Sequence, residues 1–300
     1  MTPRQGRRLD LLLVDRGLAR SRTEARGLIM AGRVYVDGLL ADKPGRLVGA
    51  TAEVRVEHPP HRYVSRGGAK LEHALRVFSL DVKGLVCLDV GASTGGFTDC
   101  LLTHGAHRVY AVDVGYGQLA WKLRRDERVV VLDRTNARYL DREALRRAAE
   151  EAGLEVVWPT FATCDLSFIS LLKVVPRVVT VLDPGWRMVL LVKPQFEATR
   201  HQVGSRGVVR DPAVHVEVLR RVVDGLSGGG VRAAGLTYSP LRGPEGNIEY
   251  LLWLEEARPD ETGGEGAAGP ASDTGGAPGY FPATAAEEVV GEAFVRVGRA

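Results

Sequence analysis

From residue 85 onwards, apolar residues follow two alternating patterns. Short runs rich in Val, Leu and Ile predict strands that are covered on both faces, and between them apolar residues recur every three to four positions, which predicts helices. The predicted strands are 85–90, 107–113, 129–133, 161–166 and 188–192, and the predicted helices are 97–104, 118–124, 142–152, 169–175 and 212–226. A final strand pair is predicted at 235–239 and 248–254. This alternation favours an α/β fold with a mostly parallel, doubly wound sheet.

The first 60 residues have a different pattern. Residues 9–17 show the apolar spacing of a helix, and Ser21 caps a second predicted helix with Glu24 at the capping-box position. Residues 33–36 and 52–56 predict short strands. We therefore expect a small α+β domain at the front of the chain.

Composition sets the domain boundaries. Pro59 and Pro60 break the chain, so the small domain is expected over 1–60, with a linker over 61–68. A helix over 69–78 then opens a larger domain over 69–256. Beyond that point Gly, Ala, Glu and Pro replace the periodic pattern, so residues 257–300 are predicted to form a disordered tail.

The first strand of the larger domain ends in a glycine-rich turn. Residues 85–99 read LVCLDVGASTGGFTD, and the strand stops at Gly91. Such a turn leaves free backbone N–H groups at the start of the next helix, where a ligand can approach the main chain. A dinucleotide fingerprint would read G-x-G-x-x-G. The pattern here is Asp-x-Gly-x-x-x-Gly-Gly, which resembles the S-adenosylmethionine loop of Rossmann-like methyltransferases.

Acidic residues mark the ends of the first three predicted strands. Asp113 lies 24 residues after Asp89, where folds of this kind bind ribose hydroxyls, and Asn136 could flank an adenine beyond Asp133. The structural alternative is that the three acids, Asp89, Asp113 and Asp133, cap the following helices. The expected cofactor contacts are Asp89, Gly91, Ser93, Thr94, Gly95, Gly96, Phe97, Asp113, Asp133, Asn136 and Asp165.

Charge and cysteine content narrow the class of protein. Residues 1–66 contain 13 basic and 7 acidic side chains, whereas residues 256–300 contain 3 and 8. A basic front end on a nearly neutral body favours a polyanionic partner. The three cysteines lack metal-ligand spacing, so no metal site is expected. No apolar run has the length of about 20 residues that a membrane helix needs, and the N-terminus lacks a signal-peptide core, which predicts a cytoplasmic protein without a membrane partner.

The front domain contains a recognisable segment, SRTEARGLIMAGRVYVDG. It resembles the S4-type RNA-binding domain over about residues 8–57. The resemblance implies that two short helices present arginines to the phosphates of structured RNA. A solvated charged helix face is the plainer alternative. The expected RNA contacts are Arg4, Arg7, Arg20, Arg22, Arg26 and Arg33.

Four charged residues follow the order of the tetrad in ribose methyltransferases of the FtsJ type: Lys70, Asp165, Lys193 and Glu249. The sequence motifs around these residues, together with the glycine-rich turn, resemble the TlyA family over about residues 8–255. The motifs are SRGGAKL, CDLSFISL, LVKPQFE, RGVVRDP and SPLRGPEGNIEYLLWL. That family joins an S4-like domain to a Rossmann-like methyltransferase domain with a mostly parallel, seven-stranded sheet. The resemblance implies an S-adenosylmethionine-dependent enzyme that 2′-O-methylates cytidine ribose in 16S rRNA, 23S rRNA or both, with ribosomal RNA or ribosomal subunits as partners.

The tetrad suits methyl transfer to a weakly acidic hydroxyl. Lys193 could accept the proton or stabilise the developing negative charge, and the sequence leaves both roles open. Lys70 would hold the nucleotide, and Asp165 and Glu249 would orient the lysines.

Three other functions are weighed against this one. A nucleobase methyltransferase often carries an Asn/Asp-Pro-Pro-aromatic motif where this chain has Asp165 followed by Leu-Ser-Phe. A non-catalytic RNA-binding assembly factor would not need the tetrad. A membrane-active haemolysin, a label given to some members of the family, would need an apolar span or a strongly amphipathic helix.

Overall fold

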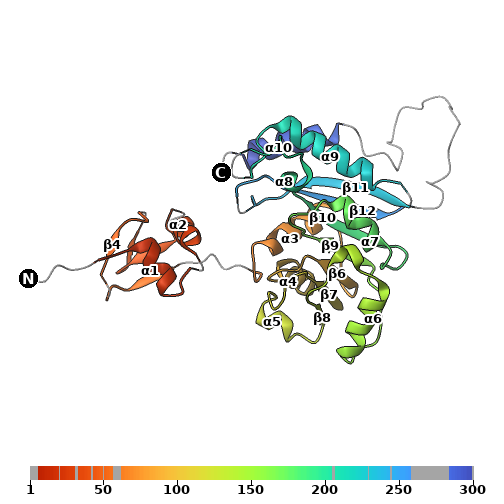
Figure 1. Cartoon of the computed structure of the whole chain (residues 1–300), viewed down its shortest axis with the longest axis horizontal. Coiled ribbons are helices and arrows are strands. Elements are labelled where there is room, and N and C mark those ends of the chain that lie inside the picture. The colour runs from red at the N-terminus through yellow and green to blue at the C-terminus, as the bar shows by residue number, and fades with distance from the viewer. Residues whose placement is uncertain are drawn as a thin grey trace, which may run out of the picture. The chain divides into compact units, whose positions relative to one another are not determined.

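The computed structural model describes residues 6–19, 21–30, 33–41, 43–49, 51–56, 62–204, 207–228, 230–243, 245–257 and 284–298. Within it the chain divides into two compact units, Met1–His61 and Arg62–Ala300, whose elements are labelled in Figure 1.

The N-terminal unit has the small α+β architecture that the sequence predicts. Its main sheet has the order β3-β2-β5, and β1 pairs with β4 in a second, two-stranded sheet. Leu9 and Leu13 of the first helix pack with Ile29 of the second, and all three are fully buried. The elements are β1 (Arg7–Arg8), α1 (Leu9–Asp15), α2 (Arg22–Met30), β2 (Val34–Val36), β3 (Leu39–Leu40), β4 (Leu47–Val48) and β5 (Val54–Val56).

The second unit is built on a seven-stranded sheet with the order β11-β12-β10-β9-β6-β7-β8. The five strands from β10 to β8 run parallel, and β12 and β11 complete the sheet in antiparallel pairing. This confirms the mostly parallel, seven-stranded sheet. The strands are β6 (Val86–Val90), β7 (Arg108–Val112), β8 (Val129–Leu132), β9 (Phe161–Cys164), β10 (Arg187–Val192), β11 (Val231–Tyr238) and β12 (Tyr250–Glu256).

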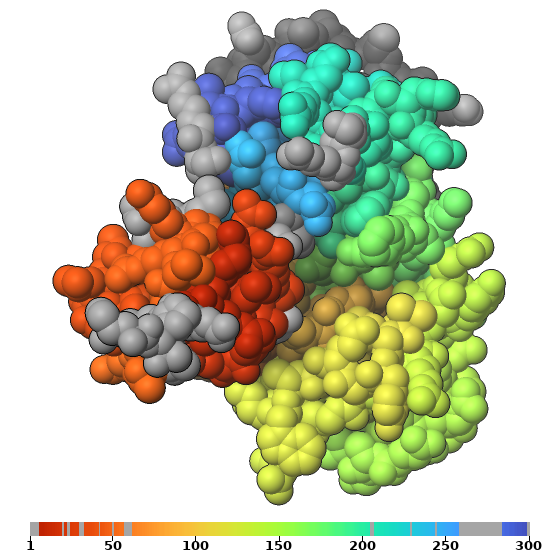
Figure 2. Space-filling view, turned by 60° about the vertical axis from the view of Figure 1, so that its left-hand side comes forward, coloured from red at the N-terminus to blue at the C-terminus, as the bar shows by residue number. Residues whose placement is uncertain are grey.

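Helices cover both faces of this sheet (Figure 1). One face packs against α3 (Gly67–Val77), α4 (Gly96–Thr103) and α5 (Trp121–Arg124). The other packs against α6 (Arg142–Glu151), α7 (Val175–Val179), α9 (Pro212–Leu226) and α10 (Ala285–Arg296), and the last two lie side by side in Figure 2. Short helical turns complete the unit: η1 (Ala137–Tyr139), η2 (Leu171–Lys173) and α8 (Pro194–Glu197).

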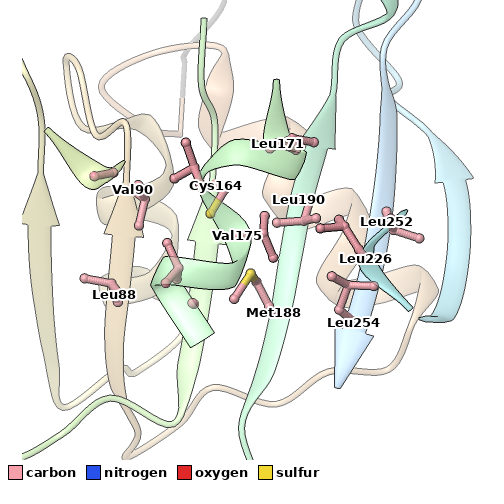
Figure 3. Close-up of a cluster of buried hydrophobic side chains, with 14 of the residues drawn as sticks. Leu88, Val90, Cys164, Leu171, Val175, Met188, Leu190, Leu226, Leu252 and Leu254 are labelled. Carbon is pink, nitrogen blue, oxygen red and sulfur yellow. The ribbon is translucent and has the colours of Figure 1, made fainter. Parts of the chain in front are cut away.

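Successive side chains of each central strand point to opposite faces of the sheet, and both faces are covered by helices, which explains the continuous apolar runs in the sequence. Met188 and Leu190 of β10 join the buried cluster on the α7 and α9 face, which Figure 3 shows in close-up. Val189 and Leu191 join the cluster on the opposite face. Because successive side chains of a strand point to opposite faces, a strand that is covered on both sides must be apolar at every position.

The strand order reverses next to β6. The chain adds β7 and β8 on one side of β6 and then returns to place β9 on the other side. In open α/β sheets, ligands bind at such a reversal, beyond the carboxyl ends of the strands. Gly91 follows β6 and Asp165 follows β9, so the glycine turn and one member of the tetrad meet there.

The segment predicted to be a linker, 61–68, is largely part of the second unit. Arg62 already belongs to that unit, and the side chain of Tyr63 is only 4% exposed within the cluster around α3. Helix α3 starts at Gly67, two residues before the predicted start. An aromatic ring that buries its surface against the sheet domain orders this segment, which the prediction from turn-forming residues overlooked.

The predicted disorder of residues 257–300 is wrong for their last part. Ala286, Val290 and Ala293 are buried on one face of α10, with the four- and three-residue spacing of a helix. Residues 258–283, 299 and 300 of the predicted tail lie outside the described residues.

The helix predicted at 169–175 is also wrong. That region forms η2, and the helix α7 starts only at Val175. Pro176 suits the first turn of a helix, because it has no N–H to contribute to an intrahelical bond. None of the described helices is long and apolar enough to cross a membrane.

Candidate active site

The glycine turn after β6 follows a path that a larger side chain would block. Gly91 has a φ of +84°, and its N–H donates to the carbonyl oxygen of Val112 on β7 at 2.8 Å. A Cβ atom on Gly91 would overlap the carbonyl oxygen of Asp165. Glycine is therefore required for β6 to turn this close to the residue that follows β9.

Asp89 lies beneath the turn, where it braces the structure. The side chain is fully buried, and its two oxygens accept hydrogen bonds from the hydroxyls of Thr98 at 2.6 Å and Thr163 at 2.9 Å. Burial raises the pKa of this carboxyl group to about 6, while the two hydroxyls oppose the shift. Its carboxylate is turned into the protein and lines neither of the two cavities described below, so contact of Asp89 with a cofactor stays a prediction.

Asp113 lines the space beyond the turn. One carboxylate oxygen accepts the N–H of Ser93 at 2.8 Å, and the other accepts the N–H of Gly115 at 2.6 Å. Asp133 is instead paired with Arg124 and accepts the N–H of Gly117 at 3.2 Å.

Asn136 both caps a helical turn and lines the space beyond the glycine turn. Its side-chain oxygen accepts the N–H of Arg138 at 3.1 Å, which caps η1. Asn136 also lines the cavity that Asp113 lines.

Two neighbouring cavities lie at the strand reversal. The first, which we call the strand-end cavity, has a volume of about 420 Å³, and its lining includes Gly91, Ser93, Asp113, Asn136, Asp165 and Phe168. The second, the lysine cavity, has a volume of about 220 Å³, and its lining includes Arg66, Lys70, Gly91, Ser93, Thr94, Gly96, Phe97, Asp165, Lys193 and Glu249. Three residues are shared by both cavities: Gly91, Ser93 and Asp165.

The structure brings the four tetrad residues to the lysine cavity as two ion pairs. Lys193, directly after β10, places its Nζ atom 2.7 Å from Oδ1 of Asp165. Lys70, one turn into α3, pairs with Oε2 of Glu249, which directly precedes β12. The Lys70 side chain is 10% exposed and that of Glu249 is 1% exposed. The second oxygen of Glu249, Oε1, has no hydrogen-bond partner among the described residues.

Several residues of the site were not singled out from the sequence. Ser167 accepts a hydrogen bond from Nζ of Lys193 at 3.0 Å. Arg66 lines the lysine cavity although only Lys70 was selected from its motif. Phe168 is 90% exposed at the rim of the strand-end cavity, with a φ of +64°. The motifs around Lys70 and Asp165 were visible, but spacing alone did not show which of their other side chains face the cavities.

The predicted RNA-binding arginines differ in their surroundings. Arg22 donates to the buried carboxylate of Asp10 at 2.9 Å, and Arg7 pairs with Asp15 at 2.6 Å. Arg26 is exposed and Arg33 is half-buried. The remaining two, Arg4 and Arg20, lie outside the described residues.

Asp10 is a structural centre of the N-terminal unit that sequence reasoning missed. Its carboxylate accepts two hydrogen bonds from Arg8, each of 3.0 Å, in addition to the bond from Arg22. These contacts, with the Arg8 hydrogen bond first, lower the pKa of Asp10 to about 2.

The fold and the glycine-turn site together define a methyltransferase of the α/β class with a separate S4 unit. The model of the family described as FtsJ-like methyltransferase matches residues 63–256, and that of the S4 domain matches residues 7–54. A relative in Mycobacterium tuberculosis, named 16S/23S rRNA (cytidine-2′-O)-methyltransferase TlyA, is 49% identical over 248 residues, which is 82% of this chain and 89% of the relative. The chain therefore belongs to the TlyA family, as its motifs predict.

Two further relatives agree with this assignment. YqxC of Bacillus subtilis, named as a candidate rRNA methyltransferase, is 52% identical over 247 residues, which is 82% of this chain and 85% of the relative. A solved structure from Streptococcus thermophilus, named as a candidate hemolysin, is 39% identical with a TM-score of 0.70, and the match covers 99% of this chain and 98% of that one.

Proposed function

We propose that the protein transfers the methyl group of S-adenosylmethionine to the ribose 2′-oxygen of cytidine in ribosomal RNA. The observation that supports this most strongly is the lysine cavity, where two lysines and two acids from four separate segments line one small space. The relative from Mycobacterium tuberculosis is named for the same reaction on 16S and 23S rRNA. Such a substrate would place the reaction in the cytoplasm.

The strand-end cavity suits S-adenosylmethionine because its lining includes a carboxylate and an amide side chain, which can bind hydroxyl and amino groups of such a ligand. Asp113 would accept hydrogen bonds from the ribose hydroxyls, since an ionised carboxylate has about four lone-pair sites and two are taken by backbone N–H groups. Asn136 lines the same space, and Gly91 leaves the main chain open to close approach. When bound, S-adenosylmethionine supplies an electrophilic methyl group. Asp133 would act indirectly, through the N–H of Gly117.

The lysine cavity suits the acceptor ribose. A ribose hydroxyl is a weak acid, so its oxygen must lose a proton or carry negative charge as it attacks. Asp165 and Ser167 hold the Nζ atom of Lys193 at fixed distances before any substrate arrives. A cation fixed in this way stabilises developing negative charge without reorganisation, which favours the electrostatic role of Lys193 over the role of general base. Lys70, held by Glu249, would bind the nucleotide.

The N-terminal unit would supply affinity for structured RNA. Arg26 and Arg33 would contact phosphates, where charge and shape matter more than base identity. Arg22 would contribute less, because Asp10 holds its guanidinium. The assembly-factor alternative gains no support, because both ion pairs of the tetrad are intact.

The proposal is tested by transfer of labelled methyl groups from S-adenosylmethionine to free rRNA and to unmodified ribosomal subunits. We expect transfer by the wild type and a loss of about 100-fold or more in Lys193→Ala, the scale of removing one group that stabilises charge in a transition state. Lys173→Ala, which changes an exposed lysine on η2, is the matched control and should remain active. No transfer to any of these RNAs by a protein that binds S-adenosylmethionine would overturn the proposed function. Full activity of Lys193→Ala would remove the proposed role of that lysine.

A further inference from the structure

Helix α10 lies outside the FtsJ-like match, which ends at residue 256, yet it packs against the part of the unit that carries Glu249. We propose that α10 positions the carboxylate of Glu249 and that Arg242 is the residue through which it acts. This inference rests on the proposed function, because the role of Glu249 in methyl transfer is itself proposed.

The first observation is a latch between the end of α10 and the loop before Glu249. Nε of Arg242 donates to the carbonyl oxygen of Val297 at 2.9 Å, just past the last residue of α10. The Nη1 atom of the same side chain donates to the carbonyl oxygen of Gly246 at 3.3 Å. A guanidinium at this point satisfies a carbonyl that the helix leaves open and is favoured by the helix dipole. The Arg242 side chain therefore connects two points of the loop, residues 242 and 246, to the end of α10.

The second observation is that this loop encloses the Glu249 carboxylate. A Cβ atom on Gly243 would lie only 2.5 Å from Oε1 of Glu249, so the main chain at 243 passes directly beside that oxygen. Three backbone hydrogen bonds close the loop. The N–H of Gly243 donates to the carbonyl oxygen of Asn247 at 2.9 Å, the N–H of Gly246 to that of Gly243 at 2.9 Å, and the N–H of Ser239 to that of Glu249 at 2.8 Å. A shift of the loop would therefore move the carboxylate that holds Lys70.

The third observation is a second connection, on the other side of Glu249. Phe294 of α10 meets the ring of His215 edge-on, with 5.1 Å between ring centroids. Nε2 of His215 lies 3.1 Å from the carbonyl oxygen of Val209, and a carbonyl can only accept, so this nitrogen carries the proton. Nδ1 of the neutral ring then accepts from the hydroxyl of Tyr250 at 2.8 Å. Tyr250 follows Glu249, so α10 is connected through His215 of α9 to the side chain of the next residue after Glu249.

These contacts predict a specific kinetic effect. Loosening the latch should displace the Glu249 carboxylate and the ammonium of Lys70 in the lysine cavity. Neither Glu249 nor Lys70 lines the strand-end cavity, so affinity for S-adenosylmethionine should stay the same. Arg242 is thus a positioning residue, and its loss should lower the rate of the chemical step.

The test compares full-length Arg242→Met with Arg220→Met. The control removes the ion pair between Arg220 and Glu287 of α10 and leaves the contacts of Arg242 in place. At saturating S-adenosylmethionine, we expect the single-turnover rate of methyl transfer to RNA to fall about tenfold in Arg242→Met and to stay within about twofold in Arg220→Met. Arg242→Lys, which can still donate one hydrogen bond, should recover part of the rate.

A double-mutant cycle separates positioning from a general loss of stability. In a Glu249→Gln background, Arg242→Met should lower the remaining rate by less than about twofold, because the carboxylate it positions is already gone. Equal rates for the Arg242→Met and Arg220→Met single variants, or a full tenfold effect of Arg242→Met in the Glu249→Gln background, would overturn the inference.

Failure of the proposed function would be visible separately, as a wild type that transfers no methyl group to RNA. In that case amide hydrogen exchange at Gly243 and Ser239 tests whether Arg242 holds the loop in place. Faster exchange at both amides in Arg242→Met, but not in Arg220→Met, supports the latch. Equal exchange in the two variants overturns it.

Discussion

Asp89 offers a test of the buried support beneath the glycine turn. The change is Asp89→Asn, which keeps the shape of the side chain but removes its charge. In the wild type, burial raises the pKa of this carboxyl group from its ordinary value of 3.8 to about 6. The nearby charge of Asp165 adds to the shift, and the hydroxyls of Thr98 and Thr163 oppose it. The folded protein therefore binds one more proton than the unfolded chain between about pH 4 and pH 6.

The size of the effect follows from this difference of about two pKa units. Each unit corresponds to about 1.4 kcal/mol, so the ionised carboxylate costs the folded state about 3 kcal/mol above pH 6. The sign is fixed by proton binding: the contribution of Asp89 to stability is fully present below its unfolded pKa and is lost as the pH rises through 6. Asn has no such transition.

The assay is urea unfolding of both proteins between pH 4 and pH 7, followed by tryptophan fluorescence. All four tryptophans, Trp121, Trp158, Trp186 and Trp253, lie in the second unit, so the signal reports that unit alone. The free energy of unfolding of Asp89→Asn minus that of the wild type should rise by about 2.4 kcal/mol from pH 4 to pH 7, because part of the full difference is already lost at pH 4. A difference that stays flat, or that falls with pH, would refute the reasoning.

Three further predictions concern other parts of the molecule. Gly91→Ala should destabilise the second unit by about 1–3 kcal/mol, measured by urea unfolding, because its Cβ would overlap the Asp165 carbonyl at a positive φ; wild-type stability would contradict this account of the turn. Asp10 has the opposite pH response to Asp89. Its contribution to the free energy of unfolding is fully present above about pH 4 and is lost as the pH falls through about 2. Protection of the α1 amides against hydrogen exchange should therefore fall between about pH 4 and about pH 2 in the wild type and change less in Asp10→Asn. Lys193→Arg should keep more methyl-transfer activity than Lys193→Met if the residue acts as a fixed cation, and equal inactivity would favour the general base.

Local patterns predicted the framework, because strands and turns depend on nearby residues. The apolar runs predicted the parallel strands, and the glycine turn at Gly91 predicted where a ligand could approach the main chain. That the strand order reverses beside this turn came only from the structure. The sequence assigned Asp165 and Glu249 to orient the lysines, but it could not show that Glu249 pairs with Lys70, since 179 residues separate the two and only the sheet order brings them together. Asp89 was selected as a ligand contact for the same reason: its partner Thr163 comes from another strand, and the sequence does not show that their side chains meet.

The C-terminal segment shows a different limit. Gly, Ala, Glu and Pro dominate the composition beyond residue 257, and that average concealed a short helix with three buried positions. The stability of α10 comes from packing on α9 and β11 rather than from its own sequence, which is the usual case for short helices.

The most direct test of the central claim is the position of the transferred methyl group. Ribosomal RNA labelled by the wild-type protein is hydrolysed with alkali, which cleaves next to every free 2′-hydroxyl. A methyl group on a ribose 2′-oxygen blocks cleavage, so we predict that the label appears in alkali-resistant dinucleotides with a 2′-O-methylcytidine at the 5′ side. Label released in ordinary mononucleotides, as a methylated base, would contradict the account of the tetrad.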